Sequence, residues 1–420
     1  MKINTYQESL AQVLSSCRPL PVEIASFFEA MGRVLADDVC ALDNDPPAAK
    51  SAMDGFCLRA FDTQAASPGS PIDLPVSGVL GAGHLPQERL DPGTALRIMT
   101  GALLPEGADA VVKQEDTSMP DERTVVLETP LTAGENVIAE GQHLRSGDQV
   151  LRSGDRVTPQ ALGMLAKLGI SSLQVHQQPR VALLAIGDEL LELTQPLKPG
   201  KLHVSNLYAL EGSILQYGGI SRRLGIARDD PDQIEDFLRP CLPESKSSSL
   251  TSDIVVTLGG SSRGDFDFAC EVFERLGAAI QFRRTQINLG PSTIFATKGS
   301  TLFFGLPGTP IPSWGAFELL MRPALLKLAG CSRWQHPCIQ ARLTDNIRAG
   351  TGPRYFVPGW LRFDSEGLAK VTPLRSKSSG TNPSALLANA LIEVPEFQSE
   401  LEKGTSVSVR SIGSDDNFLH

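Results

Sequence analysis

Apolar residues are spaced differently in successive parts of the chain, and this spacing predicts its elements. In the first 40 residues they recur at helical spacing, which predicts two helices separated by a proline-containing stretch. From about residue 54 to 133, short apolar runs divided by glycine and proline are typical of a small β-domain. Its clearest runs are 71–79, 95–99, 110–113 and 124–128. Residues 161–168 are helical in pattern again, so we expect 134–176 to fold back onto the N-terminal helices, with the β-domain as an insertion.

Beyond residue 180 the pattern alternates between strands and helices. The runs 181–186, 221–226 and 254–258 are apolar and predict strands, and the segments between them carry apolar residues on one helical face. Alternation of this kind over about 150 residues predicts a mostly parallel sheet covered by helices on both faces. Two further short strands and a closing helix are expected at 279–282, 301–304 and 313–328.

After Gly330 the pattern is again that of strands, which predicts a small C-terminal β-domain or barrel. Its strands are expected at 338–343, 354–361, 369–373, 390–394 and 406–410. The predicted domains are an N-terminal helical and linker domain (1–43 and 134–176), an inserted β-domain (44–133), an α/β domain (177–330) and the C-terminal β-domain (331–420).

Composition narrows the class of protein. With 420 residues, 41% hydrophobic and 20% charged, the chain is expected to be globular, soluble and divided into several domains. Its net charge of −10 argues against a nonspecific nucleic-acid binder, and no apolar run approaches the roughly 20 residues of a membrane span. The first residues lack an apolar signal core, so the cytoplasm is expected. The 7 cysteines are scattered without a CxxC pair, which indicates neither a disulfide framework nor a zinc site.

One loop combines features of an anion site and a metal site. The strand at 254–258 is followed by three glycines within six residues and then by Asp265 and Asp267, which open a helical pattern. A strand, a glycine loop and a helix N-terminus present backbone N–H groups to an anion. The two carboxylates would repel a phosphate unless a divalent cation lay between them. The alternative is an ordinary turn in which Asp265 caps the helix.

Other loops are expected at the same edge of the sheet, because ligands of parallel sheets bind beyond the C-terminal ends of the strands. Acidic residues or Gly and Pro dominate the four loops at 187–189, 228–231, 259–267 and 305–310.

Sequence motifs extend this pattern along nearly the whole chain. In order they are Ser51-Ala52-Met53-Asp54-Gly55, Ile98-Met99-Thr100-Gly101-Ala102, Pro105-Glu106-Gly107-Ala108-Asp109-Ala110-Val111-Val112, Gly134-Glu135-Asn136-Val137, Gly187-Asp188-Glu189-Leu190, Ser205-Asn206, Arg228-Asp229-Asp230-Pro231, the 259–267 loop and Gly305-Leu306-Pro307-Gly308. Together they resemble the motifs of the molybdopterin molybdenumtransferase family, of the MoeA and gephyrin E-domain type.

This resemblance implies a homodimer of multidomain subunits, each with a central MoaB/MogA-like three-layer α/β domain that binds molybdopterin. The cleft would be shared with the partner subunit. The implied reaction takes adenylylated molybdopterin and molybdate or tungstate as substrates, releases AMP with Mg²⁺, and places the metal on the dithiolene. A contact with the adenylyltransferase of the same pathway is also implied, and a nucleic acid or membrane partner is not.

Residue roles follow from the same resemblance. The implied catalytic residues are Asp54, Thr100, Glu189, Asp229 and Asp267. The implied metal ligands are Glu189, Asp230, Asp265 and Asp267. The residues implied to bind the pterin substrate are Ser205, Gly259, Gly260, Ser261, Ser262, Arg263, Gly264, Asp265, Pro307, Gly308 and Arg354. The structural alternatives are a turn for Asp54 and a helix cap for Asp229 and Asp230 ahead of Pro231.

Several positions depart from the family pattern, among them Gln142, Val204, Thr309 and part of the 258–264 loop, and three further departures change the charge expected at the site. His143 stands where an acid is usual, and Asn288 and Pro291 stand where two lysines are usual. A dianionic oxyanion needs compensating cations or N–H donors when it is desolvated. The cations that could compensate are Arg263, Arg283, Arg284, Lys298 and Arg354. Two hypotheses therefore stand: a divergent insertase, favoured by the retained aspartates, and a non-catalytic carrier or scaffold for the pterin or assembled cofactor, favoured by the lost lysines.

Overall fold

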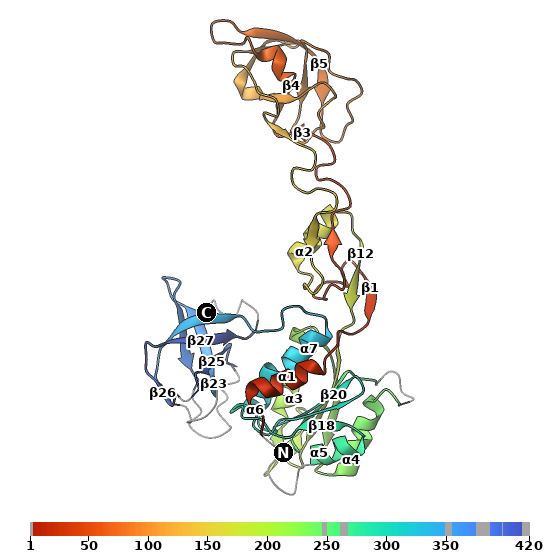
Figure 1. The fold of residues 1–420 in the computed structure, drawn as a ribbon, viewed down its shortest axis with the longest axis vertical. Coiled ribbons are helices and arrows are strands. Elements are labelled where there is room, and N and C mark those ends of the chain that lie inside the picture. Colours follow the sequence, from red (N-terminus) through yellow and green to blue (C-terminus); the bar gives the residue numbers. More distant parts are fainter. Residues whose placement is uncertain are drawn as a thin grey trace. The chain divides into compact units, whose positions relative to one another are not determined.

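The computed structural model describes residues 3–245, 250–260, 268–348, 355–374, 387–396 and 398–413. The chain folds as two compact units (Figure 1). One consists of Met1–Asp37, Ser153–Leu162 and Ser171–His420, and the other of Asp38–Arg152 and Gly163–Ile170. None of the helices in these described ranges combines the length and apolar character that a membrane span requires. The predicted boundaries of the individual domains stay a prediction.

The smaller unit contains a six-stranded sheet in the order β7-β4-β6-β5-β9-β8. Its strands are β4 (Gly55–Leu58), β5 (Ile72–Leu80), β6 (Ala95–Ile98), β7 (Ala110–Lys113), β8 (Thr117–Asp121) and β9 (Thr124–Leu127). Buried residues such as Phe56, Val112 and Leu127 fill its core, which confirms the β-strands predicted here. Short pairs join β2 (Val39–Cys40) to β11 (Gln149–Leu151) and β3 (Lys50–Ser51) to β10 (Val137–Ile138). The 3₁₀ turns η1 (Ala60–Thr63) and η2 (Gln114–Asp116) also lie in this unit.

The N-terminal segment holds one of the two predicted helices. Helix α1 (Tyr6–Ser15) begins with a capping box between Thr5 and Glu8. The second predicted helix is wrong: β1 (Val22–Ser26) forms an antiparallel pair with β12 (Ser172–His176). Ile24 and Phe28 belong to the apolar pattern that predicted this helix. In the structure they are 78% and 79% exposed, so the pattern does not correspond to a buried helix face. Helix α2 (Pro159–Lys167) forms as expected.

The central sheet has the order β16-β13-β17-β20-β19-β18. The strands are β13 (Arg180–Ile186), β16 (Ile220–Ala227), β17 (Ile254–Leu258), β18 (Ala279–Phe282), β19 (Ile294–Lys298) and β20 (Thr301–Leu306). The first four in spatial order run parallel, whereas β19 is antiparallel to both β20 and β18. This confirms the mostly parallel sheet, although the sequence pattern did not predict β19.

Helices cover both faces of this sheet, as Figure 1 shows. Val181 and Leu183 of β13 pack into one core with α1, α3 (Ser205–Gln216), α6 (Pro310–Ala316) and α7 (Arg322–Leu328). Ala182 and Leu184 pack into a second core with α4 (Pro231–Leu238) and α5 (Phe268–Arg275). Alternate residues of one strand therefore point to opposite faces of the sheet, and both faces are buried. This explains why the strand sequences are apolar throughout. The remaining helical elements are η3 (Arg239–Cys241) and the π-helix η4 (Phe317–Met321).

The C-terminal strands close into a barrel in the order β21-β24-β23-β25-β27. They are β21 (Cys338–Leu343), β23 (Tyr355–Phe363), β24 (Ala369–Pro373), β25 (Ala390–Val394) and β27 (Ser406–Ser411). Leu361, Val371 and Ile392 are fully buried inside it, which confirms the predicted C-terminal β-structure. Two short pairs complete the described strands, β14 (Leu190–Leu191) with β15 (Leu202–His203) and β22 (Ile347–Arg348) with β26 (Glu400–Leu401).

Candidate functional site

The carboxyl ends of β13, β16, β17 and β20 share one edge of the central sheet because these strands are parallel. The loop after each strand carries residues singled out from the sequence. Glu189 follows β13, Asp229 and Asp230 follow β16, Gly259 and Gly260 follow β17, and Pro307 and Gly308 follow β20. The fold thus brings these predicted site residues to a single edge.

At the centre of this edge the backbone at Gly259 packs directly against the end of β13 and against the loop after β20. Gly259 has a φ of 99°, and a Cβ there would lie 2.4 Å from the carbonyl oxygen of Ile186. Its N–H donates to the carbonyl of Leu306 at 3.0 Å, and a Cβ on Gly308 would lie 3.3 Å from the Gly259 Cα. Gly259 is therefore required by both its backbone conformation and its neighbours.

Replacement of Gly259 by alanine should therefore cost about 2–3 kcal/mol of unfolding free energy, from the left-handed conformation and the clash with rigid backbone. Gly260 is the matched control, because a Cβ there would meet a movable atom, Cδ1 of Ile186, at 3.2 Å. Gly260→Ala should cost about 1 kcal/mol. Urea unfolding of both variants measures the difference. Equal losses would show that the close approach at Gly259 does not constrain the loop.

Helix α3 begins beside this centre. Its N-cap residue, Val204, makes no side-chain capping hydrogen bond, and Ser205 is exposed at its first position. Asn206 is 6% exposed, and its Nδ2 donates to the carbonyl of Gly308 at 2.9 Å. This bond fixes the start of α3 against the loop after β20, so the positive end of the helix lies next to the glycine loops.

The acidic loops are tied to each other. The backbone N–H of Asp188 donates to Oδ2 of Asp229 at 3.2 Å, which joins the loop after β13 to the loop after β16. Oδ1 of Asp230 accepts from the N–H of Asp232 at 3.0 Å and caps α4. The helix-cap interpretation thus holds for Asp230. Glu189, Asp229 and Asp230 are all exposed, and their carboxylates border the sheet edge.

A hollow beside these loops brings in residues that the sequence pattern did not indicate. Its volume is about 610 Å³, and its lining includes Glu192, Gln195, Lys201 and Arg228. The Lys201 ammonium donates to the main-chain carbonyl of Asp188. Lys201 ends a Lys-Pro-Gly-Lys run at 198–201 just before β15, and this run was the available signal for a cation at the edge.

Positions that depart from the family pattern have defined partners. Nδ2 of Asn288 donates to the carbonyl of Phe356 at 2.7 Å, and the N–H of Phe356 donates to Oδ1 of Asn288 at 2.8 Å. The Asn288 amide is therefore bonded to strand β23. Two of the candidate compensating cations form ion pairs, Arg283 with Glu274 at 2.7 Å and Lys298 with Glu244 at 3.3 Å. His143, in the smaller unit, is exposed.

Several predicted site residues cannot be placed. Ser261, Ser262, Arg263, Gly264, Asp265, Asp267 and Arg354 lie outside the described residues.

The smaller unit holds Asp54 and Thr100 as a pair. The N–H and the hydroxyl of Thr100 both donate to Oδ1 of Asp54, at 2.7 and 2.8 Å. These hydrogen bonds hold the pKa of Asp54 below its ordinary value, so the exposed carboxyl stays ionised. Among the described residues no hydrogen bond to Oδ2 of Asp54 is found, so this oxygen faces solvent.

Three family models match successive parts of the chain. "MoeA N-terminal region (domain I and II)" matches residues 4–169, "Probable molybdopterin binding domain" matches 182–327, and "MoeA C-terminal region (domain IV)" matches 340–412.

Curated relatives and solved structures match along most of the chain. A molybdopterin molybdenumtransferase of Bacillus subtilis is 33% identical over 91% of this chain and 87% of its own length. One of Nostoc sp. is 31% identical over 92% of this chain and 88% of its own length. The crystal structure of a molybdopterin biosynthesis MoeA protein from Pyrococcus horikosii superposes with a TM-score of 0.84 at 28% identity, covering 98% of this chain and 100% of that one.

Proposed function

The chain belongs to the molybdopterin molybdenumtransferase family, which acts in molybdenum cofactor biosynthesis, and we propose that it inserts molybdate or tungstate into adenylylated molybdopterin with Mg²⁺-dependent release of AMP. The observation that carries this proposal is the meeting of glycine backbone, a helix start and carboxylates at one sheet edge. A phosphoanhydride needs both N–H donors and a cation held by oxygen ligands.

The glycine loops and the start of α3 are proposed to bind the phosphate side of the substrate. Gly259, Gly260 and Gly308 carry no side chain that would keep a phosphate away from this backbone. Because the N–H of Gly259 already donates to Leu306, other N–H groups of these loops are proposed as the donors. The uncapped start of α3, held by Asn206, adds a helix dipole of the right sign. Ser205 and Pro307 border this position and are proposed as further contacts.

The acidic loops are proposed to hold Mg²⁺ together with the substrate. Within the described ranges no group of three or more His, Cys, Asp and Glu could hold a metal ion by itself. Mg²⁺ in phosphate sites is commonly bound by one or two carboxylates, with phosphate oxygens and water completing its shell. Exposed Glu189 and Asp229 fit this mode, with Asp230 adjoining them. When bound, Mg²⁺ would offset the charge that develops on the phosphoanhydride as AMP departs.

Asp54 and Thr100 are proposed as a catalytic pair. Thr100 occupies one carboxylate oxygen of Asp54 with two hydrogen bonds, and this fixes the side chain and keeps it charged. The second oxygen can then accept a proton or orient a water molecule during transfer.

A homodimer is proposed from an exposed apolar patch formed by Val22, Ile24, Phe28 and Met31. They are 46%, 78%, 79% and 44% exposed. Large apolar side chains that are grouped on a protein surface commonly mark an interaction site. Because the family resemblance implies a homodimer, a second copy of the chain is the proposed occupant.

Phe28→Asp should separate the proposed dimer into monomers, because a charge in the middle of an apolar interface must be desolvated without a partner. The dissociation constant should rise by about 100-fold or more, as expected for an aromatic interface anchor. Phe61→Asp is the control, since Phe61 is 77% exposed but lies elsewhere, in η1. Sedimentation velocity over a concentration series checks both variants. A dimer unchanged by Phe28→Asp would exclude the patch as its interface.

The second candidate function is a carrier or scaffold that binds the pterin or assembled cofactor without turnover. It is favoured by Asn288, whose amide is bonded to the barrel and supplies no cation.

One assay separates these functions. Purified protein is incubated with adenylylated molybdopterin, Mg²⁺ and molybdate, and AMP release is followed while calorimetry measures pterin binding. An insertase releases AMP in proportion to enzyme and only with Mg²⁺. Tight pterin binding with no AMP above the enzyme-free rate would support the scaffold and exclude the insertase.

A further inference from the structure

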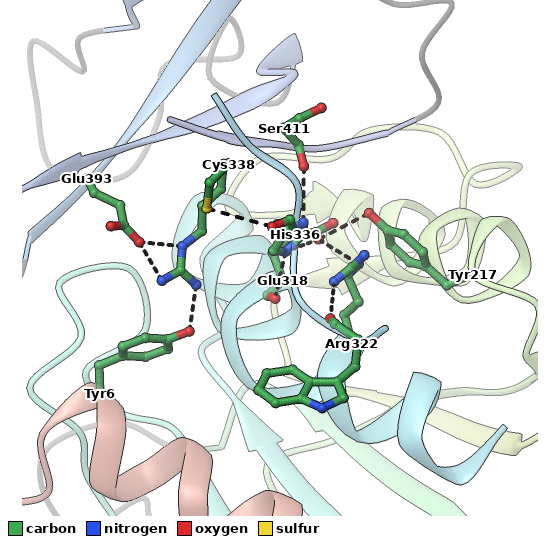
Figure 2. Close-up of polar contacts among 10 residues, drawn as sticks. Tyr6, Tyr217, Glu318, Arg322, His336, Cys338, Glu393 and Ser411 are labelled. Atoms are coloured by element: carbon green, nitrogen blue, oxygen red, sulfur yellow. Dashed lines mark hydrogen bonds and ion pairs between the residues drawn. The ribbon is translucent and has the colours of Figure 1, made fainter. Parts of the chain in front are cut away.

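A cluster of buried polar side chains lies where the chain passes from the α/β domain to the C-terminal barrel (Figure 2). Glu318 of the π-helix η4 is 2% exposed, Arg322 at the start of α7 is 7% exposed, and His336 just before β21 is 7% exposed. Tyr217, at the C-cap of α3, completes the group. Buried ionisable groups are almost always hydrogen-bonded, so each polar atom of this cluster is expected to have a partner.

The ring nitrogens of His336 both face acceptor oxygens. Nδ1 lies 3.1 Å from the carbonyl oxygen of Ser411. Nε2 lies 3.2 Å from the carbonyl oxygen of Glu318 and 3.4 Å from its side-chain Oε2. A neutral imidazole has one N–H and carbonyl oxygens cannot donate, so the contacts require one more proton, either on the imidazole or on the carboxyl of Glu318. The Glu318–His336 pair therefore holds one shared proton.

The surrounding charges decide where this proton resides. The guanidinium of Arg322 lies over the Tyr217 ring at 4.5 Å, its Nε is 3.9 Å from Oε2 of Glu318, and Tyr217 donates to Oε2 at 3.2 Å. From β27, Arg410 also faces His336, although it is paired with Glu393 and bonded to the Tyr6 hydroxyl. Burial and these two arginines lower the pKa of His336 to about 3, whereas burial raises the pKa of Glu318 to about 7. The proton is thus on Glu318, donated to Nε2, while Nδ1–H donates to Ser411.

The hydrogen bonds of His336 connect the α/β domain to the C-terminal barrel, and they depend on the shared proton. Glu318 belongs to the helical layer of the α/β domain, Ser411 ends β27, and His336 leads into β21, the strand that pairs with β27. We propose that the proton shared by Glu318 and His336 holds the barrel against the α/β domain, and that the barrel loosens as pH rises to neutrality and this proton is lost.

The direction of the pH effect follows from the raised pKa of Glu318. A carboxyl whose pKa is higher when buried contributes its full stabilisation below its ordinary pKa of 4.5. That contribution declines as pH rises above 4.5 and is fully lost once pH has passed about 7, above which stability no longer depends on this group. The deprotonated pair would place a buried carboxylate against the lone pair of Nε2, and opening the contact to water relieves this.

Hydrogen exchange followed by mass spectrometry tests the proposal on the intact chain. Protection factors, corrected for intrinsic exchange, are compared between pH 5 and 8.5 for β21 and β27, with β17 as the internal reference. Protection of the barrel strands should fall by up to about tenfold per pH unit, the limit for one proton, as pH rises from about 5 to 7, and should level off above 7, while β17 is unchanged. Glu318→Gln should abolish this fall, because a carboxamide donates to Nε2 without titrating.

Two controls keep the outcome decisive. Glu393→Gln alters the carboxylate on the barrel side of Arg410 and should leave the pH dependence in place. Glu318→Met also removes the titrating carboxyl, with a side chain of similar length, and should abolish the dependence, so it replaces Glu318→Gln if that variant does not fold. Equal corrected protection at both pH values in the wild-type chain overturns the proposal. So does a wild-type pH dependence that persists in Glu318→Gln or Glu318→Met.

Discussion

Asp54→Asn should slow AMP release and metal insertion by on the order of 10²-fold, with pterin affinity changed less than about twofold. The substitution keeps the shape of the side chain and its hydrogen-bond acceptor toward Thr100, but removes the charge that the two Thr100 bonds maintain. An amide cannot accept a proton as a carboxylate does. Single-turnover AMP release with saturating pterin measures the effect on the chemical step.

Two comparison variants sharpen this prediction. Thr100→Val removes the hydroxyl donor but keeps the N–H donor, so a loss of about tenfold is expected. Asp62→Asn is the matched control, because Asp62 also accepts a backbone N–H, from Gly93 at 2.7 Å, but was not assigned to the site. If Asp54→Asn and Asp62→Asn lost activity equally, Asp54 would have only a structural role.

Phe304→Ala should have the largest effect on stability, a loss of about 3–5 kcal/mol. Phe304 is fully buried in β20, and its ring lies 5.0 Å from that of Phe295, which itself lies 5.6 Å from that of Phe282. Truncation leaves a cavity that the rigid parallel sheet cannot fill. Urea unfolding followed by the fluorescence of Trp314, in the same core, reports this loss.

The control for this prediction is Phe363→Ala, because Phe363 is 45% exposed near the end of β23. It should cost less than about 1 kcal/mol. A similar cost for the two variants would mean that the aromatic row of β18, β19 and β20 is not the centre of this core.

The sequence predicted secondary structure best for strands that are buried on both faces. The runs that became β13 and β17 are apolar throughout because both faces of the parallel sheet are covered. Prediction failed at Val22–Ser26, because Val22 and Ile24 are exposed and their spacing does not correspond to a buried helix face. Strand β19 was missed although its signal is local: the apolar run Ile294–Ala296 leads into a turn at 299–300 that joins β19 to β20 as a hairpin.

The candidate site was predictable in its place but not in its contacts. Parallel strands bring their carboxyl ends to one edge, so the loops bearing Glu189, Asp229 and Gly259 could be grouped from the sequence alone. The close approach of Gly259 to Ile186 and the bonding of Asn288 to Phe356 depend on how separate segments pack. No local pattern encodes such contacts. Lys201 did have a local signal, the Lys-Pro-Gly-Lys run at 198–201, but its contact with the carbonyl of Asp188 comes from the packing of the loops.

The most direct test of the proposed function counts metal and nucleotide in one turnover. Excess protein loaded with adenylylated molybdopterin is mixed with Mg²⁺ and molybdate, and the AMP released and the molybdenum retained on the pterin are measured together. Our account predicts one AMP released for each molybdenum transferred, and neither product when Mg²⁺ is omitted. Pterin that stays adenylylated and free of metal, although bound to the protein, would contradict it.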